Sequence, residues 1–249
     1  MWHKLLSQMN NALNNSSASG FDYVSDRTFL VEKMTLSELE RTVVNQIRQD
    51  HSLFYDVSVN LENCQPNSQR TAFVVLGAIG CGKSTLTRLL YSKGYFTENL
   101  EFLCEDLIKW QHFNDISPLK SAYRCAKVYL HYKLGYLLQN GHNFVYELVP
   151  SNKDKIKTLN LIKDSGYKII SIYICTDSEQ ININRVASRM ALGADFVPAE
   201  KIVSRFYSTQ EHLDDIVFLS DFVYLIDSSG VGFKLIGYSG DKQIVLFNK

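Results

Sequence analysis

One eight-residue segment constrains the fold of this chain more than any other. It reads Gly-Ala-Ile-Gly-Cys-Gly-Lys-Ser from Gly77 to Ser84, which matches the phosphate-loop pattern of two glycines five positions apart followed by lysine and serine. The apolar run Phe73–Leu76 precedes it and an amphipathic stretch follows, so the pattern lies in the strand–loop–helix context that it requires. Backbone amides and a helix N-terminus converge on an anion in such a loop. We therefore predict a nucleotide site here.

The pattern also assigns a role to each residue of the loop. We expect Lys83 to neutralise the β- and γ-phosphates of ATP and Ser84 to bind Mg²⁺. Cys81 lies at a helix N-terminus beside Lys83, a setting that lowers the pKa of a thiol and would suit a catalytic cysteine. Because this position of the pattern is variable and contributes its backbone amide, we expect instead that nucleotide binding is sensitive to thiol reagents. The expected nucleotide contacts are Gly77, Ala78, Ile79, Gly80, Cys81, Gly82, Lys83, Ser84 and Thr85.

The rest of the chain alternates short apolar runs with longer amphipathic stretches, which predicts an α/β fold of the P-loop NTPase type. Five strands are expected in a mainly parallel sheet between two helical layers. The strands are expected at Phe73–Leu76, Glu101–Cys104, Phe144–Val149, Ile169–Cys175 and Phe222–Ile226, and the helices at Lys83–Ser92, Pro118–Gln139, Ser151–Asp164, Ser178–Leu192 and Pro198–Leu219. The tail from Gly232 to Lys249 alternates apolar and polar residues and predicts a β-hairpin.

Residues 1–68 are expected to form a helical N-terminal extension to a nucleotide-binding domain of residues 69–249. Asn10–Gly20 is small and polar, as in a linker. Thr35 begins a capping box with Glu38, and apolar residues then recur at helical spacing, which predicts a helix over 36–50.

The overall composition excludes several classes of protein. The 26 Lys and Arg residues balance 26 Asp and Glu residues, so no net positive charge favours nucleic acid or an anionic membrane as a partner. Apolar runs such as Lys168–Thr176 are far shorter than a membrane span, and the polar Met1–Leu13 does not resemble a signal peptide. The 5 cysteines form no CxxC pair, which argues against a disulfide framework or a zinc site. We expect a cytoplasmic protein.

A phosphate loop alone does not distinguish a switch, a motor, a transporter ATPase and a small-molecule kinase. The chain has no guanine-reading NKxD motif. The strand Phe144–Glu147 ends in a single glutamate rather than the Asp-Glu pair of large ATPases. A small-molecule kinase is favoured.

Two sets of carboxylates follow predicted strands, where open α/β sheets place their ligands. Glu105 and Asp106 follow the second strand, and Asp106 is our candidate general base for an attacking hydroxyl. The alternative is that both acids cap a helix that begins at Leu107. Glu147 ends the third strand, where it would hold substrate hydroxyls or a metal-bound water, or else be an ordinary strand-end carboxylate.

Arg185 and Arg189 lie four residues apart, so they share one face of a predicted helix. Two guanidinium groups there suit the charge of a phosphoryl group in flight. The alternative is a solvated face or an ion pair with Asp177 or Glu179. Arg205, on the next helix, is a weaker candidate for the same role.

Taken together, the phosphate loop, the strand-end carboxylates and the arginine-bearing helix resemble the zeta toxin family of phosphate-loop kinases. The resemblance extends from about Thr71 to Asp227. It is carried by the loop block TAFVVLGAIGCGKSTL, by LCEDLIKW from Leu103, by NFVYE from Asn143, by GYKIISIYI from Gly166, by INRVASRMALGADFVPAEKIVSRFYS from Ile183 and by DFVYLIDSS from Asp221.

The resemblance implies the strand order of nucleoside monophosphate kinases and transfer of the ATP γ-phosphate to a hydroxyl of a sugar nucleotide such as UDP-N-acetylglucosamine. Asp106 matches the family's catalytic base, and Arg185 matches an arginine at the transferring phosphate. Glu147, with Glu105 and Lys109 from the LCEDLIKW block, is expected to bind the substrate. The resemblance further implies an antitoxin partner at the N-terminal region.

Two departures from the family bear on the acceptor. Leu148–Ser151 replace the small polar residues that commonly follow the strand-end glutamate. Asp195 stands where relatives carry histidine or arginine. Three alternatives therefore stay open: a kinase of NAD or a nucleoside, a secreted effector acting in a host cytosol, and a nucleotide-binding regulatory protein without transfer activity.

Overall fold

The computed structural model describes residues 70–97, 100–240 and 243–247, which fall in two compact units. Within those ranges, the first unit holds 71–97, 145–240 and 243–247, and the second holds 70 and 100–144. The extension predicted for residues 1–68, with its linker at 10–20 and its helix at 36–50, lies outside the described residues.

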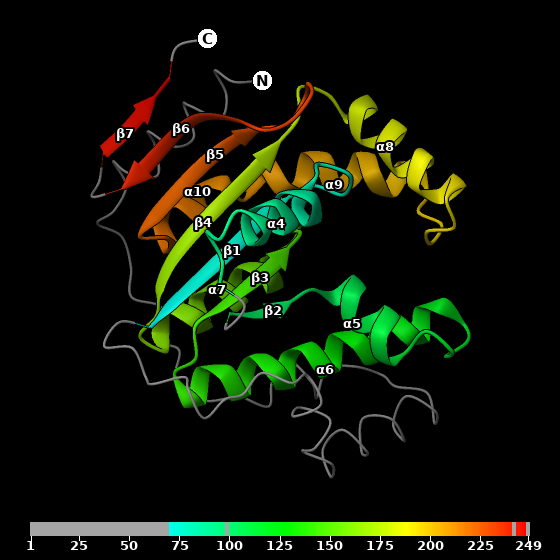
Figure 1. Cartoon of the computed structure of the whole chain (residues 1–249), viewed down its shortest axis with the longest axis horizontal. Coiled ribbons are helices and arrows are strands. Elements are labelled where there is room, and N and C mark those ends of the chain that lie inside the picture. Colours follow the sequence, from blue (N-terminus) through cyan, green and yellow to red (C-terminus); the bar gives the residue numbers. More distant parts are fainter. Residues whose placement is uncertain (1–69, 98–99, 241–242, 248–249) are drawn as a thin grey trace. The chain divides into compact units, whose positions relative to one another are not determined.

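The first unit is built on a sheet in the order β3-β1-β4-β5-β6-β7, and all of β3 except its first residue belongs to this unit (Figure 1). Strand β1 pairs in parallel with β4, and β4 pairs in parallel with β5. The sequences of the parallel strands are continuously apolar rather than alternating, because helices cover both faces of a parallel sheet. The bounds are β1 Thr71–Gly77, β3 Phe144–Leu148, β4 Lys168–Cys175, β5 Phe222–Asp227, β6 Lys234–Gly240 and β7 Gln243–Leu246.

The predicted hairpin forms as β6 and β7, and it extends the sheet beyond the five strands expected. Strand β6 pairs antiparallel with β5, and β7 pairs antiparallel with β6. Tyr224 of β5 and Tyr238 of β6 face each other with ring centroids 6.4 Å apart, a cross-strand aromatic pair of the kind that fixes register.

Helices cover both faces of this sheet, as the alternation predicts. In Figure 1 helix α4 lies in front of the sheet, while α7, α9 and α10 lie behind it. The bounds are α4 Lys83–Ser92, α7 Lys153–Asp164, α8 Glu179–Ala191, α9 Ala199–Glu211 and α10 Leu213–Leu219.

The single helix predicted over Pro198–Leu219 is wrong, because the chain forms α9 and α10 with a break at His212. The break coincides with a start signal for a new helix. Asp214 and Asp215 lie in the first turn of α10, where acidic side chains interact favourably with the helix dipole, and the His212 ring nitrogen lies 3.2 Å from Asp215.

The second unit contains β2 (Glu101–Leu103), α5 (Glu105–His112) and α6 (Leu119–Asn140). Helix α6 ends at Asn140, and the C-cap residue Gly141 has the positive φ of 73° that closes a helix. Lys133 of α6 forms a buried ion pair with Glu101 of β2, at 2.7 Å. Strand β2 is one residue shorter than expected, and the two acids after it belong to the helix.

None of the helices within the described ranges combines the length and the apolar character that a membrane span needs.

Candidate functional site

The loop that joins β1 to α4 requires glycine at three positions, because the backbone there adopts conformations that other residues rarely adopt. Gly77, Gly80 and Gly82 have φ values of 144°, 81° and 101°. A Cβ on Gly77 would lie 2.3 Å from the Ile174 carbonyl oxygen, and one on Gly80 would lie 2.7 Å from the Asn182 carbonyl oxygen. The glycines therefore allow both the turn and the close approach of β4 and α8 to the loop.

Lys83, the first residue of α4, folds its side chain back along the loop. Its Nζ donates hydrogen bonds to the carbonyl oxygens of Gly77, at 3.0 Å, and Ala78, at 2.9 Å. An ammonium group has three N–H donors, so these two bonds hold the charge against the loop and, among the residues that the structure describes, leave one donor for a ligand.

Ser84, which the sequence pattern assigns to Mg²⁺, donates a hydrogen bond to Oε2 of Glu147 at 2.8 Å. Glu147 lies in β3 and is 8% exposed. A hydroxyl and a carboxylate supply the hard oxygen ligands that Mg²⁺ prefers, and Mg²⁺ usually takes few protein ligands beside the substrate phosphates. The pair therefore fits the ion that the sequence predicts.

Arg185 reaches the same loop indirectly, through Ser228 at the end of β5. Its guanidinium donates to the Ser228 hydroxyl at 3.2 Å and to the Ser228 carbonyl oxygen. The Ser228 hydroxyl in turn donates to the Cys81 carbonyl oxygen at 2.7 Å. Arg189 is on the same helix, α8, but its side chain is exposed.

Sequence reasoning missed three buried polar residues around this loop: Ser228, Asn182 and Thr176. The Asn182 side-chain amide donates to the Ile79 carbonyl oxygen at 2.8 Å, and Thr176 donates to the Asn182 amide oxygen at 2.7 Å. A signal for them was present, because Thr176 and Ser228 follow the parallel strands β4 and β5 at the edge where Glu147 was sought.

The segment between β5 and β6 also touches the loop through an aromatic ring. A Cβ on Gly82 would lie 3.3 Å from Cε1 of Phe233, so this ring packs directly against the glycine that precedes Lys83. The segment therefore meets the loop at Cys81, through Ser228, and at Gly82, through Phe233.

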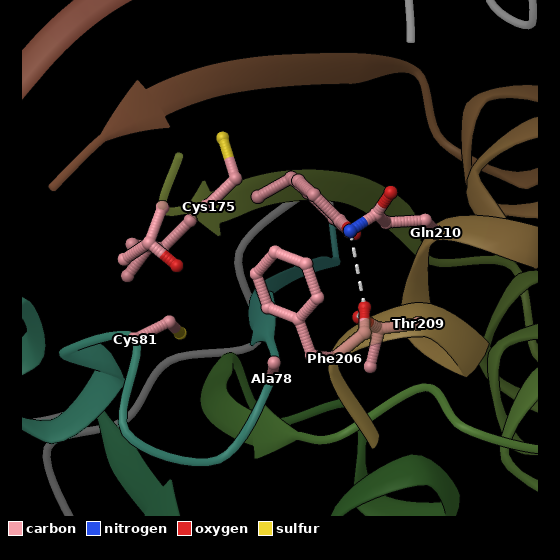
Figure 2. A pocket seen from close by; sticks show the side chains of 9 residues that line it. Ala78, Cys81, Cys175, Phe206, Thr209 and Gln210 are labelled. Carbon is pink, nitrogen blue, oxygen red and sulfur yellow. Dashed lines mark hydrogen bonds between the residues drawn. The ribbon is translucent and has the colours of Figure 1, made fainter. Parts of the chain in front are cut away.

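The predicted lowering of the Cys81 pKa is wrong. The Cys81 side chain is fully buried, and this burial raises the pKa of the thiol more than the nearby Lys83 lowers it. Figure 2 shows Cys81 beside a small cavity behind the loop, which Cys175, Phe206 and Thr209 also line. A buried, protonated thiol is a packing group, so the expected sensitivity to thiol reagents loses its basis.

Three further site candidates, Glu105, Asp106 and Lys109, lie in the second unit, on helix α5. The helix begins at Glu105 rather than at Leu107, with Cys104 as its N-cap residue, so Glu105 and Asp106 occupy its first turn. Asp106 is exposed and Glu105 is half-buried. Lys109, on the same helix, is buried; its Nζ lies 3.4 Å from the Asn114 side-chain oxygen and 5.8 Å from the centre of the Tyr123 ring.

Arg205 of α9 is half-buried and donates a hydrogen bond to the hydroxyl of Ser151, in the segment that follows β3. The structure thus brings the loop, Glu147 and Arg185 together in the first unit. It groups Glu105, Asp106 and Lys109 on one short helix of the second unit.

Comparison with known proteins gives a family match. The family model described as "Zeta toxin" matches residues 57–226. No curated protein sequence matches the chain.

Several solved structures share the fold. One belongs to the PezAT chromosomal toxin–antitoxin system of Streptococcus pneumoniae, with 15% identity, a TM-score of 0.54, and coverage of 79% of this chain and 82% of that one. Another is an AvrRxo1-ORF1:AvrRxo1-ORF2 structure with sulphate ions, with 17% identity, a TM-score of 0.55, and coverage of 84% and 69%. A structure of the same pair with ATP has 15% identity, a TM-score of 0.51, and coverage of 92% and 76%.

Proposed function

This chain belongs to the Zeta toxin family and is a P-loop kinase, and from that premise we propose that it transfers the γ-phosphate of ATP to a hydroxyl of a sugar nucleotide such as UDP-N-acetylglucosamine. The observation that carries the proposal is the hydrogen bond between Ser84 and Glu147 beside the bent-back Lys83. It joins a phosphate loop to an oxygen pair suited to Mg²⁺.

Each residue near the loop has one task in this proposal. The loop amides from Ala78 to Thr85 bind the ATP phosphates, and Lys83 neutralises their charge. Ser84 and Glu147 hold Mg²⁺, which neutralises phosphate charge when it is bound. Arg185 contacts the phosphoryl group in flight, and Arg189 provides a second positive charge on the same helix.

Asp106 is the proposed general base. An exposed carboxylate in the first turn of a helix is free to accept a proton from an acceptor hydroxyl, and it sits where a strand ends. Glu105 and Lys109 are proposed to orient the acceptor. The contact of Lys109 with Asn114 also gives that lysine a structural role, because it fixes the end of α5.

The experiment is a product analysis with the full-length protein. We would incubate it with ATP, Mg²⁺ and a pool of UDP-sugars, NAD and nucleosides, and detect phosphorylated products by mass spectrometry. We expect one phosphate added to a UDP-sugar, and no product with Lys83→Ala. The matched control is Asp164→Asn, which changes an exposed carboxylate at the end of α7.

The outcomes separate the competing functions. Phosphorylated NAD or nucleoside in place of a UDP-sugar would replace the proposed acceptor and keep the kinase. ATP binding with no phosphorylated product from any acceptor would favour a nucleotide-binding regulatory role.

The domain boundary and the partner are part of the same proposal. We assign 69–249 to the kinase domain and 1–68 to an extension that binds an inhibitory antitoxin. A partner of this kind would co-purify with the full chain when the two are co-expressed, and would be lost when the 1–68 segment is deleted.

A further inference from the structure

Ser228 occupies a junction between the phosphate loop and Arg185. It is 1% exposed, and its hydroxyl contacts the Cys81 carbonyl oxygen at 2.7 Å and the Arg185 guanidinium at 3.2 Å. A second contact to the Cys175 carbonyl oxygen is longer, at 3.3 Å. One buried hydroxyl thus joins residues from three separate elements: the loop, β4 and α8.

The chemistry of these groups fixes the direction of each bond. A guanidinium only donates, so the Ser228 hydroxyl must accept from Arg185. A carbonyl only accepts, so the single hydroxyl proton goes to one of two carbonyl oxygens, and the one of Cys81, at 2.7 Å, is nearer than the one of Cys175, at 3.3 Å. Arg185 also donates to the Ser228 carbonyl oxygen, so the guanidinium group is bonded to two oxygens of the same residue. Within the described part of the chain, these bonds use two of the five N–H donors of Arg185, so three others can bind a phosphate.

A second bond keeps α8 in register with the loop. Asn182, one turn before Arg185, is fully buried and donates to the Ile79 carbonyl oxygen. Thr176 fixes the Asn182 amide by donating to its oxygen. Gly80, between the two bonded carbonyls, lets α8 approach closely: a Cβ there would lie 3.0 Å from Cγ2 of Val186.

We propose that Ser228 is a positioning residue, which sets the guanidinium of Arg185 against the phosphate loop so that it recognises the γ-phosphate. The proposal rests on the role given to Arg185 under "Proposed function". It deepens that role, because it makes the arginine's position depend on a serine outside both the loop and α8.

The test is a double-mutant cycle on nucleotide affinity, which needs no acceptor. Calorimetry would give the Kd of MgATP and of MgADP for the full-length wild type, Ser228→Ala, Arg185→Ala and the double variant. We expect Arg185→Ala to reduce the preference for ATP over ADP by about tenfold and Ser228→Ala by about fivefold, within the usual range for coupled neighbours. The double variant should match Arg185→Ala alone.

Two kinds of result would overturn the proposal. One is a Ser228→Ala effect of the same size with and without Arg185, or equal weakening of ATP and ADP, because the serine would then only support the loop. The other is unchanged ATP preference in Arg185→Ala, because there would be no arginine contact to position.

Two further variants guard against a trivial loss of folding. Ser228→Thr keeps the hydroxyl and should keep more of the ATP preference than Ser228→Ala. Ser188→Ala removes an exposed hydroxyl of α8 that bonds only the Asn184 carbonyl oxygen in the described structure, and it should leave both affinities unchanged. Failure of the kinase proposal looks different: the wild type would yield no phosphorylated product while the cycle of affinities still showed coupling.

Discussion

The loop region of the first unit and the start of α5 in the second unit are organised in different ways. Around the loop, buried side chains bond to backbone carbonyls, as Ser228 and Asn182 do at 1% and 0% exposure. At the start of α5, Asp106 projects from a first turn and is exposed. The contrast teaches that the residues around the phosphate loop are fixed by buried contacts of the fold, whereas Asp106, the proposed general base, is a single exposed side chain.

The largest expected effect tests the exposed half. Asp106→Asn should lower kcat by about 10²- to 10⁴-fold, because it removes the proposed general base. The Kd of MgATP should stay within about twofold, since the loop contacts are unchanged. Steady-state kinetics with calorimetry would measure both, and transfer at the wild-type rate would remove Asp106 from catalysis.

The second-largest expected effect concerns the buried ion pair between Lys133 and Glu101, which lies in the second unit. Lys133→Met leaves the buried Glu101 without its partner and should destabilise the fold by about 3 kcal/mol. Denaturant unfolding followed by circular dichroism would show it. Glu101→Leu combined with Lys133→Met should restore most of the loss, and no recovery would mean that the pair is not the cause.

Glu147→Gln tests the loop region of the first unit, where Glu147 accepts a hydrogen bond from Ser84. We expect kcat to fall by at least about 10-fold, with a higher Mg²⁺ requirement, because the variant replaces one of the two oxygen groups proposed to hold Mg²⁺. A Mg²⁺ titration of activity would test this. An increase in the acceptor KM alone, with an unchanged Mg²⁺ requirement, would assign Glu147 to the acceptor.

The smallest expected effect concerns Cys81. Burial raises the pKa of the Cys81 thiol, so at neutral pH it stays protonated and little of the thiolate that reacts with iodoacetamide is present. Peptide mass spectrometry should find Cys81 unmodified after treatment of the folded protein at neutral pH, and modified in urea. Rapid modification in the folded state, with loss of ATP binding, would show that the loop opens.

Much of the fold followed from the sequence, because hydrophobic runs and glycine positions act locally. The end of α6 at Gly141 needs only a residue that tolerates a left-handed backbone. The break at His212 was missed because buried positions continue at helical spacing across it, from Phe206 and Thr209 to Leu213 and Ile216. Such spacing does not mark a break of one residue between two helices.

In the candidate site, too, local features were predicted and contacts between distant residues were missed. The loop was found because its contacts are made by consecutive backbone groups. Ser228 and Asn182 were missed because each bonds a carbonyl more than a hundred residues away in the chain, 147 residues for Ser228 and 103 for Asn182. The error at Cys81 has a physical cause as well: the sequence shows the neighbouring lysine but not the depth of burial that outweighs it.

The contact of Phe233 with Gly82 connects the β6–β7 hairpin to the phosphate loop. Because Phe233 directly precedes β6, a bound nucleotide that immobilises the loop also restrains the start of that strand. Linkage is reciprocal, so the free energy by which ATP suppresses opening of the hairpin equals the free energy that the closed hairpin contributes to ATP affinity. If the loop binds ATP as proposed, the last strands of the sheet would respond to nucleotide occupancy, and amide hydrogen exchange in β6 would report it.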